Sequence, residues 1–223
     1  MKKLLLCLML AGMFSAQAQS TAFAEKGNYI TLGYGFPNLY KGILRNAYST
    51  SSFVSGNESY SYSTSGAGPL FLKYEYGIAD HIGIGLVLGY YSAGVQQTYN
   101  YTEQNYNPQT GATTTSNFKD VSKMDIVNSS LGLRFNYHFG SKEKLDPYIG
   151  FAAGYSYTKV TLSFSSNNPD HTQGSVSAVS PIPIYLGLTF GMRYYLSQNV
   201  GLYGEFGLDK WAVLQLGLAF KFQ

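Results

Sequence analysis

Several charged side chains lie in segments in which large apolar residues alternate with small residues. Six of them share the face of small residues: Lys73, Glu75, Arg134, Arg193, Glu205 and Lys221. Cations and carboxylates that share one face can pair across a narrow space, whereas contact with hydrocarbon would be costly for each of them. We therefore predict a polar network among these six residues, either as structural packing or as the lining of a narrow passage.

Histidine, hydroxyl and carboxylate groups form no strong catalytic pattern. Nucleophilic catalysis needs a hydroxyl beside a base that a third group orients. His138 and Ser141 are close in sequence, but they fall beside a short turn, as does His81. Only His171, next to Asp170, lies in a long polar stretch, and the three histidines lack metal-ligand spacing. We predict no catalytic residue, no metal and no cofactor, with a lipid-modifying enzyme as the remote alternative.

The elements that must position the charged residues are segments with period-two alternation, which is typical of strands. In HIGIGLVLGYY, residues 81–91, isoleucine and leucine face one way and mostly glycine faces the other. Eight such segments occur, at residues 28–36, 69–76, 81–91, 124–139, 148–157, 184–194, 201–209 and 214–222. Each core is near the roughly 9–11 residues that a tilted strand needs to cross a bilayer.

The large apolar face is better suited to lipid than to a protein core. A soluble barrel would turn this face inward, but the interior of eight strands is only just wide enough to be filled by side chains. The reverse arrangement places the large groups in lipid and small residues in the lumen, and closure pairs every backbone polar group. The pattern predicts an all-β, eight-stranded antiparallel up-and-down transmembrane barrel, with a soluble β-sandwich as the alternative.

The connections alternate in length. Short turns occur at residues 77–81, 140–147 and 197–199, and long polar stretches at 38–68, 96–123 and 165–180; the last connection, at 209–211, is short. Short turns on one side and long loops on the other are the layout of bacterial outer-membrane barrels, in which the long loops are extracellular.

Outward-facing aromatic residues fall near both ends of the strands. They are Tyr34, Tyr90, Tyr157 and Trp211 toward the long loops, and Tyr76, Tyr137, Phe139 and Tyr194 toward the short turns. Tyrosine and tryptophan favour membrane–water interfaces, so we predict two interfacial aromatic girdles.

The long stretch at residues 96–123 contains a turn signal between two aromatic runs. Tyr99, Tyr101 and Tyr106 precede Asn107-Pro108-Gln109-Thr110-Gly111, and Phe118 follows. We predict a hairpin that extends the third and fourth strands outward. Together with residues 165–180 it would form a protruding sheet, whose open edge can accept a partner's strand. The alternative is a solvated loop without a partner.

The first residues have the pattern of a secretory signal peptide: Lys2-Lys3, an apolar run at residues 4–14, and Ala16-Gln17-Ala18. We predict cleavage after Ala18, with Ala24 as the second choice, and a short periplasmic segment at residues 19–27. The only cysteine lies within the signal peptide. The formal net charge of the whole chain is +3, and the absence of a basic stripe or nucleic-acid motif predicts no nucleic-acid partner.

Taken together, residues 28–223 resemble the small eight-stranded bacterial outer-membrane β-barrel proteins, the OmpX-like and OmpA-transmembrane-domain-like group often labelled porin-family proteins. The resemblance implies an integral protein in contact with outer-membrane lipid. Its role would be structural or in surface interaction, such as adhesion to an unidentified ligand, with a narrow channel for small solutes as the alternative. It also implies that barrel-assembly machinery reads the C-terminal strand through Phe220 and Phe222, although Gln223 follows them where the family usually ends in an aromatic residue.

Overall fold

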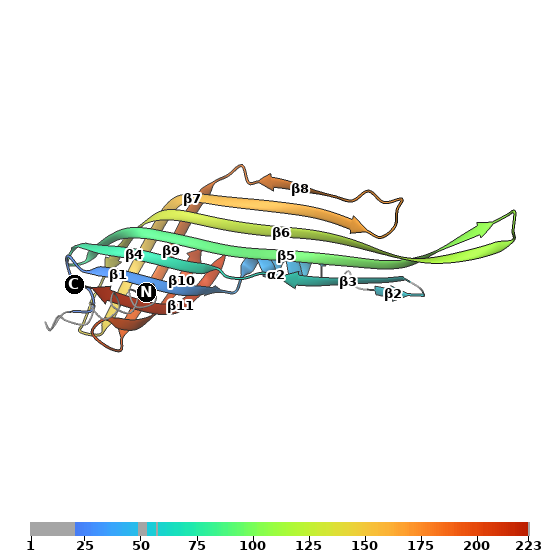
Figure 1. Ribbon diagram of the computed structural model, residues 1–223. Coiled ribbons are helices and arrows are strands. Elements are labelled where there is room, and N and C mark those ends of the chain that lie inside the picture. Colours follow the sequence, from blue (N-terminus) through green and yellow to red (C-terminus); the bar gives the residue numbers. More distant parts are fainter. Residues whose placement is uncertain (1–20, 49–52, 57, 223) are drawn as a thin grey trace, which may run out of the picture.

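The computed structural model describes residues 21–48, 53–56 and 58–222. Eight strands form the barrel: β1 (Asn28–Phe36), β4 (Leu70–Ala79), β5 (Ile82–Asn107), β6 (Ala112–His138), β7 (Leu145–Ser166), β9 (Ile184–Tyr195), β10 (Val200–Asp209) and β11 (Ala212–Phe222). Each pairs antiparallel with the barrel strands before and after it, and β1 pairs with both β4 and β11. The ring is therefore closed (Figure 1), which confirms the predicted eight-stranded barrel.

Three further strands and a helix lie on the side of the long connections. They are α2 (Leu39–Tyr48), β2 (Phe53–Ser55), β3 (Glu58–Ser65) and β8 (Gly174–Val179). We refer to β2, β3, β8 and the outer parts of β5, β6 and β7, residues 92–107, 112–127 and 156–166, as the loop-side sheet. This sheet extends far beyond one side of the barrel (Figure 1). No helix in the described part of the chain is long and apolar enough to cross a membrane.

The β5–β6 hairpin is the longest feature of the loop-side sheet. Its pairing runs without a register shift from Ile82↔Tyr137 in the barrel to Asn107↔Ala112 at the tip. The predicted hairpin at residues 96–123 is thus a direct continuation of two barrel strands. Toward the barrel, β3 supports one side of this ribbon and β7 the other.

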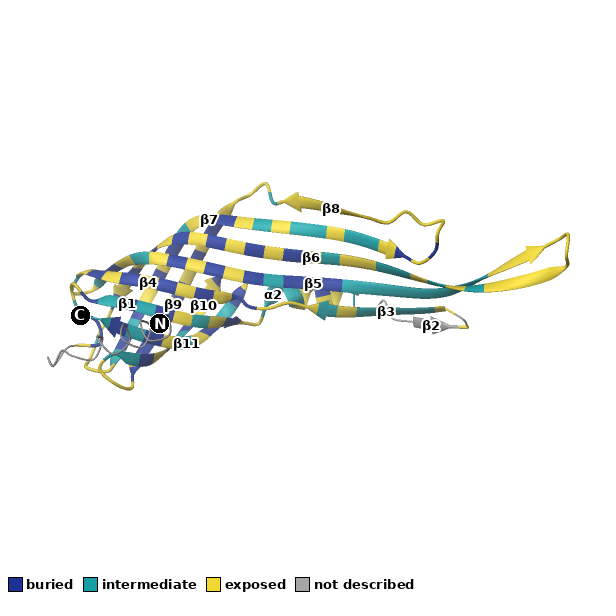
Figure 2. Ribbon diagram, in the orientation of Figure 1, coloured by how far each residue is buried: buried dark blue, intermediate teal, exposed yellow. Residues whose placement is uncertain are grey.

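The two faces of each barrel strand differ sharply in exposure (Figure 2). On β5, Leu86 and Leu88 are 45% and 46% exposed, whereas Val87 between them is fully buried. This assignment matches the predicted one, in which the large apolar residues face outward. Because side chains alternate along a strand, a slip of one residue would exchange the two sets.

The residues that fill the lumen are not as uniformly small as the sequence indicated. Six tyrosines are buried in the interior: Tyr29, Tyr91, Tyr148, Tyr185, Tyr195 and Tyr203. The rings of Tyr148, Tyr185 and Tyr203 lie over glycines of other strands. A Cβ built on Gly132 would lie 2.6 Å from the Tyr185 ring, and one on Gly191 would lie 2.4 Å from the Tyr148 ring. At these positions the glycine face provides the room that the three rings fill.

Candidate functional site

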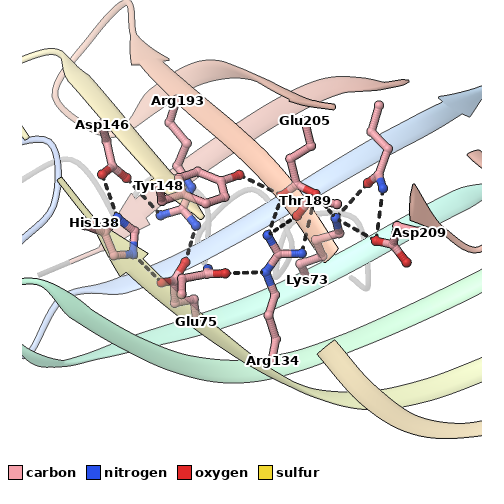
Figure 3. Close-up of polar contacts among 12 residues, drawn as sticks. Lys73, Glu75, Arg134, His138, Asp146, Tyr148, Thr189, Arg193, Glu205 and Asp209 are labelled. Carbon is pink, nitrogen blue, oxygen red and sulfur yellow. Dashed lines mark hydrogen bonds and ion pairs between the residues drawn. The ribbon is translucent and has the colours of Figure 1, made fainter. Parts of the chain in front are cut away.

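Three long polar side chains meet across the middle of the barrel (Figure 3). Lys73 Nζ on β4 lies 2.5 Å from Glu205 Oε2 on β10, and Arg134 Nη2 on β6 lies 2.6 Å from Glu205 Oε1. Lys73 also donates to Gln215 Oε1 at 2.7 Å and to Asp209 Oδ2 at 3.4 Å. We call these five residues the loop-side cluster. All are buried, so their charges are held by one another rather than by water.

A second group of charges lies nearer the short turns. His138 Nδ1 is 2.6 Å from Asp146 Oδ1, and His138 Nε2 is 2.7 Å from Glu75 Oε1. Both ring nitrogens face carboxylate oxygens, which is the arrangement in which an imidazolium donates through both of them. Arg193 contacts Glu75 and donates to Asp146 Oδ2 at 3.3 Å. These four residues, the turn-side cluster, balance two cations against two carboxylates.

Tyr148 joins the two clusters. Its hydroxyl donates to Glu205 Oε1 at 2.7 Å. The guanidinium groups of Arg193 and Arg134 lie 4.8 and 5.7 Å from the centre of its ring, within range of cation–π attraction. The polar network therefore continues across the interior from one cluster to the other (Figure 3).

The residues before β1 cover the turn-side cluster. The ring of Phe23 stacks on that of His138, with centroids 3.5 Å apart and an interplanar angle of 8°. The backbone N–H of Phe23 donates to Ser141 Oγ at 2.9 Å, and that of Ala22 donates to the Lys142 carbonyl at 2.7 Å. Phe23 is only 2% exposed. Residues 21–24, which we call the N-terminal plug, thus pack into the turn-side end of the barrel.

Five of the six charged residues singled out in the sequence belong to the two clusters. The sixth, Lys221, lies at the turn-side end, donates to the Thr21 carbonyl at 3.2 Å and sits 5.0 Å from the Tyr195 ring. Sequence reasoning missed five members of the network: His138, Asp146, Tyr148, Asp209 and Gln215. A signal for His138 was present, because it continues the lumen-facing alternation of residues 128–136.

The predicted girdle residues lie on the outer face of the barrel, and their exposed fractions range from 37% to 49%: Tyr34, Tyr76, Tyr90, Tyr137, Tyr157, Tyr194 and Trp211. Tyr34 and Tyr90 both pair with Leu70, which sets them at one height near the loop side. Tyr76 pairs with Ile84 at the other end of the same strand. Their role at the membrane interfaces stays a prediction.

Three of the four aromatic residues proposed for the long loop lie together. The Tyr99 and Tyr101 rings stack at 5.1 Å, and Phe118 lies 5.5 Å from Tyr101. A hydrogen bond with the Glu58 carboxylate raises the pKa of the Tyr99 phenol. Tyr106 lies apart near the hairpin tip and is 65% exposed.

His171 folds back onto this aromatic group rather than forming a site with its neighbour Asp170. Its Nδ1 lies 3.1 Å from Asp120 Oδ2 and 3.4 Å from the Tyr101 hydroxyl. Ser166 Oγ donates to the other oxygen of Asp120 at 2.5 Å. The Ser166 hydroxyl therefore bonds to the Asp120 carboxylate. A catalytic nucleophile would instead have to bond to the histidine.

Comparisons with known proteins place this chain. One similar solved structure is Ail, the attachment invasion locus protein of Yersinia pestis, with 13% sequence identity and a TM-score of 0.41; the match covers 89% of this chain and 99% of that chain. A second is the outer membrane protein OprG of Pseudomonas aeruginosa, with 14% identity, a TM-score of 0.38, and coverage of 93% of this chain and 100% of that chain. A third is the N-terminal β-barrel domain of Pseudomonas aeruginosa OprF, with 14% identity, a TM-score of 0.31, and coverage of 90% of this chain and 100% of that chain. No curated protein matches. A sequence model for the Opacity family porin protein matches residues 88–218, more than half of the chain. The chain is therefore an outer-membrane β-barrel that belongs to the Opacity family of porin proteins.

Proposed function

We propose that this protein is a surface-interaction protein, in which a filled barrel anchors the loop-side sheet as an extracellular binding surface. The observation that carries the proposal is the uninterrupted run of β5 and β6 out of the barrel to the tip at Asn107↔Ala112. Strands that continue this far beyond the barrel serve no purpose in closing it. They carry a two-stranded ribbon well beyond the end of the barrel (Figure 1).

The chemistry of the loop-side sheet suits recognition. Tyrosine, asparagine, glutamine, serine and threonine predominate at residues 96–117, and tyrosine with small polar residues is also the composition of antibody binding loops. The outer edge of β8 provides a second contact, because β8 pairs only with β7 among the described strands. Val176 and Val179 on this strand are 71% and 51% exposed. Such an edge can accept a partner's strand.

The interior supports an anchor rather than a passage. A solute would have to separate Glu205 from Lys73 and Arg134, and then displace the stacked Phe23 and His138 rings. Breaking a buried ion pair costs about 3–5 kcal/mol when one partner is removed. Membership of a porin family favours the alternative function, a narrow channel for small solutes, and the experiment below separates the two.

The proposal extends to the setting of the barrel. The outward apolar face would contact outer-membrane lipid, the short turns would lie in the periplasm, and barrel-assembly machinery would read β11 through Phe220 and Phe222. The proposed role is not catalytic. No group of three potential metal ligands occurs among the described residues.

The N-terminal plug bears on the predicted signal peptide, residues 1–18, which lies outside the described residues. Cleavage after Ala24 would remove the buried Ala22 and Phe23, whereas cleavage after Ala18 would keep them in the mature protein. The packing of the N-terminal plug thus supports Ala18 as the cleavage site.

The test compares binding with conductance in the full mature chain, reconstituted in lipid. One variant replaces residues 102–117 with an Asn-Gly turn, and Lys142→Gln in an exposed short turn serves as the control. Arrays of glycans and extracellular-matrix proteins should reveal saturable binding that the shortened hairpin loses and the control keeps. Planar bilayers should show no discrete conductance. Discrete conductance that changes in Arg134→Ala, together with array signals that the shortened hairpin retains, would establish the channel instead.

A further inference from the structure

A cavity lies at the loop-side mouth of the barrel, away from the hairpin tip. Its volume is about 390 Å³, within the range of about 300–1,000 Å³ that is typical of small-molecule sites. Leu39 and Tyr40 of α2 line one wall. The floor is polar and includes Asn128, Ser156 and Lys210.

One wall of this cavity has a notch. The end of β9 pairs with β7 up to Ile184↔Tyr155, but its pairing with β10 begins only at Gly187↔Asp209. Among the described strands, residues 184–186 therefore have no β10 partner. The rim of the notch is apolar and faces outward, with Ile182, Leu186 and Leu208 between 64% and 69% exposed. The notch thus connects the polar floor with the lipid-facing side of the barrel.

Lys210 provides the floor with a buried positive charge. Its backbone has a positive φ of 49° in the β10–β11 turn, and its ammonium group donates to Ser156 Oγ at 2.7 Å and to Asn128 Oδ1 at 3.0 Å. The same group lies 4.9 Å from the centre of the Tyr185 ring. Each of these partners is neutral. Although Lys210 is only 8% exposed, no carboxylate among the described residues forms a salt bridge with it.

The nearest carboxylate is already engaged. Asp209 accepts hydrogen bonds from Tyr185, Gln215 and Lys73. Within the two clusters, four cations face four carboxylates, so Lys210 adds a charge that the network does not balance. An ammonium group has three N–H donors, and two of them bond to neutral oxygens. A buried charge of this kind is stabilised by an anion, since a charge-assisted hydrogen bond is stronger than a neutral one.

We propose that this cavity binds one anionic amphiphile, with its carboxylate or phosphate group beside Lys210 and its hydrocarbon chain passing through the notch along Ile184, Leu208 and Trp211. The polar floor and the apolar rim are arranged for a molecule with this polarity. Membrane lipids and free fatty acids share this chemistry, and both can reach a notch on the lipid-facing side. The site belongs to the barrel mouth and goes beyond the binding role proposed for the loop-side sheet.

The only tryptophan of the chain makes the proposal directly testable. Trp211 lies on the rim, is 46% exposed, and contacts the Tyr40 ring edge-on at 4.5 Å. The full mature chain in phosphatidylcholine nanodiscs is titrated with dodecanoate or with dodecanol while Trp211 fluorescence is recorded. Dodecanoate should bind at least about tenfold more tightly, because only the anion gains a charge-assisted hydrogen bond. Lys210→Met should abolish this preference, whereas Lys159→Met, an exposed lysine on β7, should retain it.

Brominated lipids identify the source of the ligand. Stronger quenching of Trp211 by brominated phosphatidylglycerol than by brominated phosphatidylcholine, lost in Lys210→Met, would assign the site to membrane lipid. A preference for dodecanoate alone would assign it to free amphiphiles. Equal affinity for dodecanoate and dodecanol, without a preference for phosphatidylglycerol, would overturn the proposal. If Lys210→Met does not fold, the unmodified protein decides the question through two comparisons: dodecanoate against dodecanol, and brominated phosphatidylglycerol against brominated phosphatidylcholine.

Discussion

The substitution Glu205→Gln tests whether the charged lumen is what holds the barrel closed. Glu205 accepts hydrogen bonds from Lys73 at 2.5 Å, from Arg134 at 2.6 Å and from Tyr148 at 2.7 Å. The glutamine side chain has nearly the same shape but no charge, so both cations lose their main counterion in a buried site. Removal of one partner of a buried pair costs about 3–5 kcal/mol. We expect a loss of this size in the free energy of unfolding.

The measurement is a reversible urea titration in lipid vesicles, followed by Trp211 fluorescence and by the mobility of unboiled samples on SDS gels. Glu143→Gln is the matched control, because Glu143 is exposed in a short turn. It should change the free energy of unfolding by no more than about 0.5 kcal/mol. Both variants remove one negative charge, so a difference between them reports burial rather than net charge.

A double variant sharpens the test. When Lys73→Met is added to Glu205→Gln, one of the two stranded cations is removed as well, so the double variant should be more stable than the sum of the single changes predicts. An additive result, or a cost below about 1 kcal/mol for Glu205→Gln alone, would refute the reasoning. Water would then reach these groups, and the interior would be open enough for the channel alternative.

Three further predictions concern packing, processing and the hairpin. Gly33→Ala should destabilise the barrel by about 1–3 kcal/mol in the same titration, because a Cβ there would lie 1.5 Å from the Tyr203 hydroxyl; Gly42→Ala in α2, with open space around it, should be neutral or stabilising by up to about 1 kcal/mol. Intact-mass analysis of protein extracted from membranes should give a chain that begins at Gln19, and a chain that begins at Glu25 would contradict the role of the N-terminal plug. Tyr106→Ser should leave unfolding unchanged within about 0.5 kcal/mol while it weakens binding on the arrays.

The barrel could be predicted because alternation, glycine content and connection length all report the same constraint. A strand between lipid and a crowded lumen must place large apolar groups on one face and small or paired polar groups on the other. The bounds of β1, residues 28–36, followed directly from this pattern. The continuation of β5 and β6 followed from the turn signal at residues 107–111.

The elements that were missed lack this constraint. Residues 39–48 lie in a long connection outside the barrel strands, and their helix packs through Tyr40, Leu44 and Tyr48 against β5. The spacing of four between these residues fits one helix face, but such a short run does not stand out from a loop. The pairs of residues that meet across the barrel were equally hard to predict from the sequence. Lys73 and Glu205 are separated by 132 positions, and only the closure of the ring brings them together.

The fixed register of β5 and β6 links the two parts of the proposed function. An isolated two-stranded hairpin is marginally stable in water, yet the pairing of these strands begins inside the barrel, where Ile82↔Tyr137 is anchored. Closure of the barrel already holds the two strands side by side, so the outer ribbon forms by extending an existing pairing and loses little further chain entropy. A partner that adds a strand to the loop-side sheet would therefore bind a surface that is ordered beforehand and lose less affinity to ordering. A substitution of Glu205 that weakens the charged network should then lower the affinity for a partner at the hairpin tip only when the barrel itself opens.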